Sequence, residues 1–175
     1  GLWSFFVLPM TVTALSALLA NIEHGPRAWD HMLALPIQRW RLFLAKALIL
    51  MGVVGVMTAL LALELRIVGA AFSAFAPSMA PRGPFPWDLA TRILLGMWGA
   101  SLFMAMIQLW VALRFRSFVA PLTIGLGGTF VAVSAFDAKE AMWVPWAMPV
   151  SIVGHDGLNA LPALQLGLVG GLVTL

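Results

Sequence analysis

The stretch Phe43–Leu63, FLAKALILMGVVGVMTALLAL, decides the fold of this 175-residue chain. Its only charged residue is Lys46. The apolar residues follow one another continuously, without the period of two that strands of a membrane β-barrel show. A helix needs about 20 mostly apolar residues to cross the hydrocarbon core of a bilayer. The sequence therefore predicts that this stretch is a transmembrane helix.

The composition of the whole chain supports this prediction. Hydrophobic residues make up 62% of the chain and charged residues 10%, whereas a soluble domain carries about 25% charged residues. A soluble core could not hide so much apolar surface, so lipid is the expected solvent. The net charge of +3 is small and dispersed, which argues against a nucleic-acid-binding protein. The chain has no cysteine and therefore no disulfide framework.

Further apolar runs predict further spans. They are Leu2–Ala20, Ile93–Leu113, Phe118–Phe136 and the unfinished Leu158–Leu175. Glycines recur inside the spans and allow helix backbones to approach closely. We therefore expect an all-α, polytopic transmembrane helix bundle that forms one domain over residues 1–175. Because the chain starts at Gly1 and stops inside an apolar run, we expect the native protein to continue at both ends.

The connections between the spans differ in length and charge. They are the basic Asn21–Leu42, the long and proline-rich Glu64–Arg92, the short Arg114–Ser117, and Asp137–Gly157. Six basic residues fall on one side of the bundle: Arg27, Arg39, Arg41, Lys46, Arg114 and Arg116. Four fall on the other side: Arg66, Arg82, Arg92 and Lys139. Because cytoplasmic loops are enriched in basic residues, the first side is predicted to be cytoplasmic.

The basic connection contains a predicted amphipathic helix. Gly25–Pro26 can start it, because proline suits the first position of a helix, and Pro36 can end it. Between them, Trp29, Met32 and Leu33 form one apolar stripe at helical spacing. Two uses are open for such a helix. It can lie on the lipid surface as an anchor, or it can dock into a groove on a cytoplasmic partner.

Glu23, followed by RAWDHMLALPIQRWRLFLAK at Arg27–Lys46, resembles the loop after the second span of ABC-2 type permeases. The likeness is closest to the branch of lantibiotic-immunity and bacitracin-resistance permeases. The shared features are an acidic residue where the helix leaves the membrane, a tryptophan, a Leu-Pro pair, an arginine three residues after the proline, and a lysine one turn into the next span.

This resemblance implies a six-span permease in which one span precedes Gly1. Pro26–Leu35 would be a short cytoplasmic coupling helix seated on an ABC ATP-binding subunit, and the turn at Arg114–Ser117 would be a smaller second contact. The segment VPWAMP, residues 144–149, would dip back into the outer leaflet, where protein must cover its backbone. The contact residues that the resemblance implies are Glu23, Arg27, Trp29, Asp30, Met32, Leu33, Arg39, Arg114 and Arg116.

The sequence gives no sign of catalysis or of a resident cofactor. It has no GxxxxGK[ST] phosphate loop, and GLGG at 125–128 lies inside an apolar span, where it indicates helix packing. His24 and His31 are separated by the helix-breaking Gly25–Pro26, which argues against a metal site. We expect no catalytic, cofactor-binding or metal-binding residue in this chain. The resemblance implies ATP and Mg²⁺ on the partner subunit.

Two polar residues near or within the spans have two open interpretations each. Glu64, with Arg66 close to it, either marks a helix end at the membrane interface or lines a transport pathway. Gln108 lies deep in the Ile93–Leu113 span, where it either makes an interhelical hydrogen bond or lines the pathway.

Three functions compete. The leading one is the permease subunit of an ATP-driven transporter in the bacterial cytoplasmic membrane, paired with a second permease subunit as a homodimer or heterodimer. The apolar spans with few fixed charges favour an amphipathic peptide, antibiotic or lipid-like substrate, and the resemblance implies export. The alternative is a non-transport scaffold or accessory membrane protein whose basic loop binds anionic lipid. A membrane-embedded enzyme is the third, but it needs polar residues that converge at one depth, and the sequence indicates none.

Overall fold

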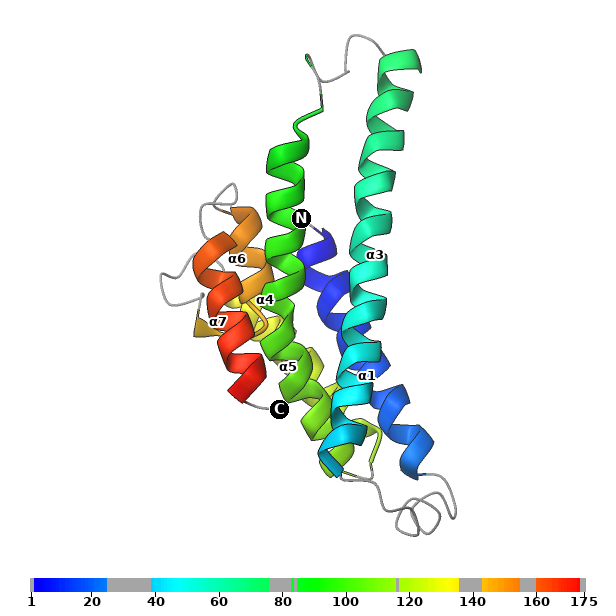
Figure 1. Cartoon of the computed structure of the whole chain (residues 1–175), viewed down its shortest axis with the longest axis vertical. Coiled ribbons are helices and arrows are strands. Elements are labelled where there is room, and N and C mark those ends of the chain that lie inside the picture. The colour runs from blue at the N-terminus through cyan, green and yellow to red at the C-terminus, as the bar shows by residue number, and fades with distance from the viewer. Residues whose placement is uncertain are drawn as a thin grey trace.

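The computed structural model describes residues 2–24, 39–75, 83, 85–115, 117–135, 143–154 and 160–173. In chain order the elements are the π-helical turn η1 (Trp3–Val7), α1 (Leu8–His24), α3 (Arg39–Phe75), α4 (Trp87–Arg114), α5 (Val119–Ser134), α6 (Met148–Gly154) and α7 (Ala160–Val173). The described residues contain no strand. The predicted all-α bundle is confirmed (Figure 1).

Within the described residues, three helices are long and apolar enough to cross a membrane. They are Trp3–Ile22, Trp40–Phe75 and Trp87–Arg114, and they include most or all of the first three predicted spans. The other two predicted spans correspond to shorter apolar helices, α5 with 16 residues and α7 with 14.

The connection predicted at Glu64–Arg92 is wrong over most of its length. α3 continues through its first part to Phe75, and α4 already begins at Trp87. No proline interrupts α3, and the helix ends two residues before Pro77. Pro86 stands at the N-cap of α4. The prediction placed the boundary at the first charge, but a charged residue affects membrane depth and does not end a helix.

α4 is the central helix of the bundle. It contacts α1, α3, α5, α6 and α7. In Figure 1, α3 runs along one side of α4 and α6 and α7 lie on the other. Met104, Met106 and Leu109 of α4 form the core together with Val12 of α1 and Leu50 of α3. Such contacts hold helices together in lipid by close packing, because lipid tails are as apolar as the side chains.

α7 packs closely against α4. A β-carbon at Gly167 would lie 2.7 Å from the carbonyl oxygen of Gly99, and one at Gly170 would lie 2.6 Å from the ring of Phe103. A larger residue at either position would push the two helices apart. The predicted packing role of the glycines in the last span is therefore confirmed.

The connection predicted at Asp137–Gly157 contains the short helix α6. Its residues Met148, Val150 and Ile152 are buried, as is Ala147 directly before it. α6 contacts α4, α7 and η1. This part of the connection is therefore folded into the bundle.

Candidate functional site

One end of the bundle gathers basic residues from separate parts of the sequence. α1 ends there, α3 begins there, and the turn from α4 to α5 lies there (Figure 1). Arg41, in the first turn of α3, and Arg114, in the last turn of α4, are exposed. We call this part of the molecule the basic end and define it by Arg41, Lys46 and Arg114.

The contact residues implied by the resemblance fall at the basic end or in the segment that joins α1 to α3. Glu23 lies in the last turn of α1, Arg39 is the first residue of α3, and Arg114 ends α4. The coupling helix predicted at Pro26–Leu35 lies outside the described residues, as do Arg27, Trp29, Asp30, Met32, Leu33 and Arg116. The helices that flank this segment both reach the basic end (Figure 1).

Lys46 joins α3 to α1 at the basic end. Its Nζ donates a hydrogen bond of 2.5 Å to the carbonyl oxygen of Leu19. The ammonium group is thus placed near the C-terminal end of α1, where the helix dipole favours a cation. The bond links the two helices that flank the predicted coupling helix.

The turn between α4 and α5 is as short as the sequence predicts. α4 ends at Arg114, Phe115 has an extended conformation, and α5 begins at Val119. The backbone N–H of Val119 donates a hydrogen bond of 3.3 Å to Oγ of Ser117. A hydroxyl at this position satisfies one of the free donors at a helix start. Arg114 is exposed where this turn begins.

Glu64 does not mark the end of a helix. It is exposed on α3, and eleven further helical residues follow it. The helix-end interpretation is therefore wrong, and the pathway interpretation stays a prediction. Arg66 places its guanidinium carbon 5.3 Å from the ring centroid of Trp87 on α4. This is a cation–π contact between the two helices.

Gln108 is fully buried where α4 meets α1 and α5. Its Nε2 donates a hydrogen bond to the carbonyl oxygen of Pro121 in α5, so the structure contains the interhelical bond that the sequence allowed. A β-carbon at Gly125 would lie 2.1 Å from Oγ1 of Thr13 and 2.8 Å from Nε2 of Gln108. Three side-chain oxygens have no hydrogen-bond partner among the described residues: Oε1 of Gln108, Oγ1 of Thr13 and Oγ of Ser16. We call Thr13 and Gln108, which both lie against Gly125, the polar cluster; Ser16, three residues after Thr13 on α1, is buried as well.

Sequence reasoning found Gln108 but missed Thr13 and Ser16. Hydroxyl side chains in helices can bond to the carbonyl one turn back, as Thr129 does in α5. Hydroxyl residues in an apolar span therefore give no distinctive signal. The nearest signal is Gly125 in the GLGG segment, because its missing side chain makes room for Thr13 and Gln108.

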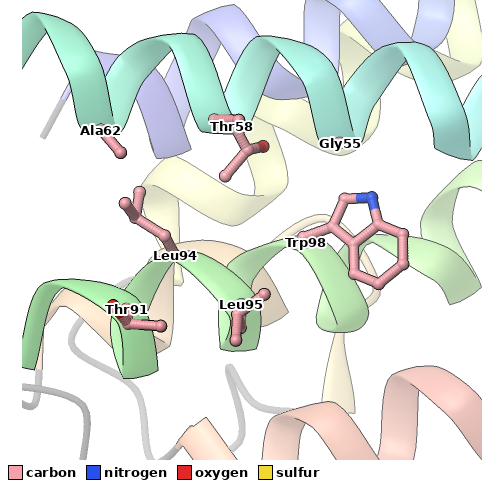
Figure 2. Close-up of a pocket in the computed structure, with 8 residues that line it drawn as sticks. Gly55, Thr58, Ala62, Thr91, Leu94, Leu95 and Trp98 are labelled. Carbon is pink, nitrogen blue, oxygen red and sulfur yellow. The ribbon is translucent and has the colours of Figure 1, made fainter. Parts of the chain in front are cut away.

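A groove of about 360 Å³ lies between α3 and α4 (Figure 2). Its walls are Gly55, Thr58, Ala59 and Ala62 of α3, and Thr91, Leu94, Leu95 and Trp98 of α4. Nε1 of Trp98 donates a hydrogen bond of 2.9 Å to the carbonyl oxygen of Met51. Sequence reasoning missed this groove, because it depends on which faces of two apolar helices meet.

The comparison with protein families decides what this bundle is. Residues 1–132 match the family described as ABC-2 family transporter protein. The chain belongs to this family. The match covers η1, α1, α3, α4 and most of α5, so it includes the basic end and the polar cluster of the permease. The comparisons with curated proteins and with solved structures gave no match.

Membership of the family gives the permease its general role. It is a multi-pass membrane protein and the permease subunit of an ABC transporter. The family implies an ABC ATP-binding subunit as its partner.

Proposed function

We propose that this permease exports an amphipathic peptide, antibiotic or lipid-like molecule, and that its basic end is the contact with the ATP-binding subunit. One observation carries the proposal: α1, α3 and the α4–α5 turn all reach the same end of the bundle (Figure 1). The predicted coupling helix Pro26–Leu35 and the predicted second contact at Arg114–Ser117 are therefore expected on one face. A single subunit could bind both.

The charge pattern supports a cytoplasmic position for this face, because basic residues favour the cytoplasmic side of a membrane. The resemblance to lantibiotic-immunity and bacitracin-resistance permeases supports a bacterial cytoplasmic membrane and the direction of export. It also supports a pair of permease subunits, either two copies of this chain or this chain with a sister subunit.

The proposed mechanism is mechanical, and ATP with Mg²⁺ binds on the partner subunit. ATP closes the paired ATP-binding subunits, the coupling helices move with them, and the spans alternate between two arrangements. A movement of residues 25–38 reaches α1 and α3 together, because the bond from Lys46 to Leu19 links these helices. α4 contacts both helices and also α5, α6 and α7, so it passes the displacement to the rest of the bundle.

An amphipathic substrate fits the surface of the permease. Large apolar side chains are exposed along α3, among them Leu48, Val56 and Leu60, and a substrate with an apolar part can contact them. Glu64 and Gln108 are the proposed pathway residues. Since Gln108 is buried among α1, α4 and α5, a substrate can reach it only when these helices separate.

Co-purification of the full permease with its ATP-binding subunit tests the proposal. Trp29→Ala should weaken both this association and transport while the helices stay folded, because truncating a buried aromatic anchor often costs about 2 kcal/mol or more. Arg114→Ala is the matched control. It should have a smaller effect, because one charge at the rim of an interface contributes little.

Full ATP-binding-subunit association and full substrate-stimulated hydrolysis in Trp29→Ala would show that Pro26–Leu35 does not dock as proposed. A permease that co-purifies with no ATP-binding subunit would favour the alternative function, a non-transport membrane scaffold with a basic lipid-binding loop.

A further inference from the structure

The groove between α3 and α4 is closed at one end by a tryptophan and carries a cation beyond the other. At the closed end, the Trp98 indole is bonded to the carbonyl of Met51, and a β-carbon at Gly55 would lie 3.0 Å from its Nε1 (Figure 2). Arg66 follows Gly55 by eleven residues in α3, and Trp87 precedes Trp98 by eleven residues in α4. Arg66 lies against the ring of Trp87. Both contacts share one antiparallel register, and the groove starts at the first contact and ends about one turn before the second, at Ala62 and Thr91.

The distance along the helices from the Gly55–Trp98 contact to the Arg66–Trp87 contact corresponds to the thickness of one leaflet of a bilayer. Eleven residues of an α-helix rise about 16 Å, and a hydrocarbon core of about 30 Å gives each leaflet about 15 Å. Trp87 and Arg66 are residues of the kinds that collect at the membrane–water interface. The walls of the groove, in contrast, are apolar apart from Thr58 and Thr91. The groove therefore lies at the depth of acyl chains and Arg66 at the depth of headgroups.

The chemistry of the groove walls suits an acyl chain. An acyl chain needs no hydrogen-bond partner. The groove suits it, because Oγ1 of Thr58 is bonded to the carbonyl of Val54 within its own helix.

The charge beyond the open end fits a phosphate. A guanidinium group can bond two phosphate oxygens at once, and Arg66 is exposed, so its N–H groups can reach a lipid headgroup. Two carboxylates lie close in sequence to Arg66 or to its contact Trp87. Glu64 is two residues away on α3, and Asp88 is in the first turn of α4, where the helix dipole favours a negative charge.

We infer that this groove binds one acyl chain of a membrane phospholipid, with the lipid phosphate on Arg66, in the leaflet opposite to the basic end. The inference rests on the membrane location of the permease and is independent of which substrate the transporter moves. The site lies on one chain, so it exists in each permease subunit of a pair.

Native mass spectrometry of the full permease with its ATP-binding subunit, titrated with dipalmitoyl phosphatidylglycerol, tests the inference. One lipid molecule per permease chain should remain bound when the others dissociate. Arg66→Gln should raise the dissociation constant of this lipid about tenfold, because it removes a hydrogen bond to a charged group. Ala59→Leu should abolish retention by filling the groove, and Ala62→Leu is a second groove-filling variant.

The matched control is Ala45→Leu, at an exposed alanine of α3 outside the groove. It should not change lipid retention. The inference is overturned if Arg66→Gln or the groove-filling variants retain the lipid as the unaltered protein does, or if the control loses it equally. It is also overturned if Ala59→Leu changes the oligomeric state and leaves lipid retention intact, because the groove would then be a contact between subunits.

Discussion

The side chain of Gln108 donates a hydrogen bond to the backbone carbonyl of Pro121, across the interface between α4 and α5. The short turn makes these two helices neighbours, and the bond fixes how one lies against the other. Hydrogen bonds between helices in a membrane average about 0.6 kcal/mol and reach about 1.7 kcal/mol. The bond from Gln108 therefore orients α5 against α4, and it adds little to the total free energy of unfolding.

Replacing Gln108 with methionine should lower the stability of the purified permease by less than about 2 kcal/mol. The side chain keeps nearly the same length, so the loss comes from the bond to Pro121. The apparent Tm in detergent measures it, and Gln165→Met on the exposed face of α7 is the matched control. If Gln108→Met leaves Tm unchanged and alters transport, the pathway interpretation of Gln108 is favoured over the structural one.

Gly125→Ala should destabilise the bundle by about 1–3 kcal/mol, the usual cost of overpacking. The new β-carbon would meet Oγ1 of Thr13 at 2.1 Å. Thr13→Ala in the same chain should recover part of the loss, because it removes the hydroxyl and methyl groups in the way. At Gly127 no atom of the described residues lies within 4 Å of a β-carbon, so Gly127→Ala should not lower Tm and should raise it slightly, because alanine favours a helix more than glycine does. Equal effects at the two glycines would contradict this packing.

Lys46→Met should weaken the connection between α1 and α3 by about 1.5 kcal/mol or more, because a hydrogen bond from a charged group to Leu19 is lost. Methionine keeps most of the apolar stem. The free energy of unfolding checks the effect, with Arg41→Met as the control. Arg41 makes an exposed cation–π contact with Trp40, 5.5 Å from its ring centroid, which contributes only about 0.5–1 kcal/mol. A free energy of unfolding in Lys46→Met that equals that of the unaltered permease would show that the Lys46 bond contributes little.

A cysteine at Ala28 should be protected from a membrane-impermeant thiol reagent in intact cells, and a cysteine at Ala80 should react. The expected difference follows from the distribution of basic residues between the two sides. The chain has no cysteine of its own, so each variant carries a single target. Labelling at Ala28 together with protection at Ala80 would show that the orientation of the permease is the reverse of the predicted one.

The helices could be predicted from the sequence, because an unbroken apolar run of span length has few other stable forms in lipid. The basic end could also be predicted, since successive spans end on alternate sides of the membrane and every second connection therefore lies at the same end of the bundle. The end of α3 could not, because a charged residue such as Glu64 is compatible with a helix that continues to Phe75. Proline positions were the better guide: α3 ends just before Pro77 and α4 begins just after Pro86.

The polar cluster and the α3–α4 groove could not be predicted, for a common physical reason. A helix that is apolar on all sides has no polar face to indicate which side is buried. Thr13 and Ser16 therefore look like Thr123, which is exposed and bonded to the carbonyl of Val119. The pairing of Arg66 with Trp87 depends equally on the register of two helices, which no local pattern encodes.

The length of α3 has a mechanical consequence. The helix runs unbroken for 37 residues, from Arg39 at the basic end to Phe75, which corresponds to about 55 Å. A rigid rod of this length that tilts by about 5° around its Arg39 end moves its far end by about 5 Å, roughly one helical turn. A small rotation of α3 at the basic end, as the proposed mechanism requires, would therefore become a large displacement at its Phe75 end.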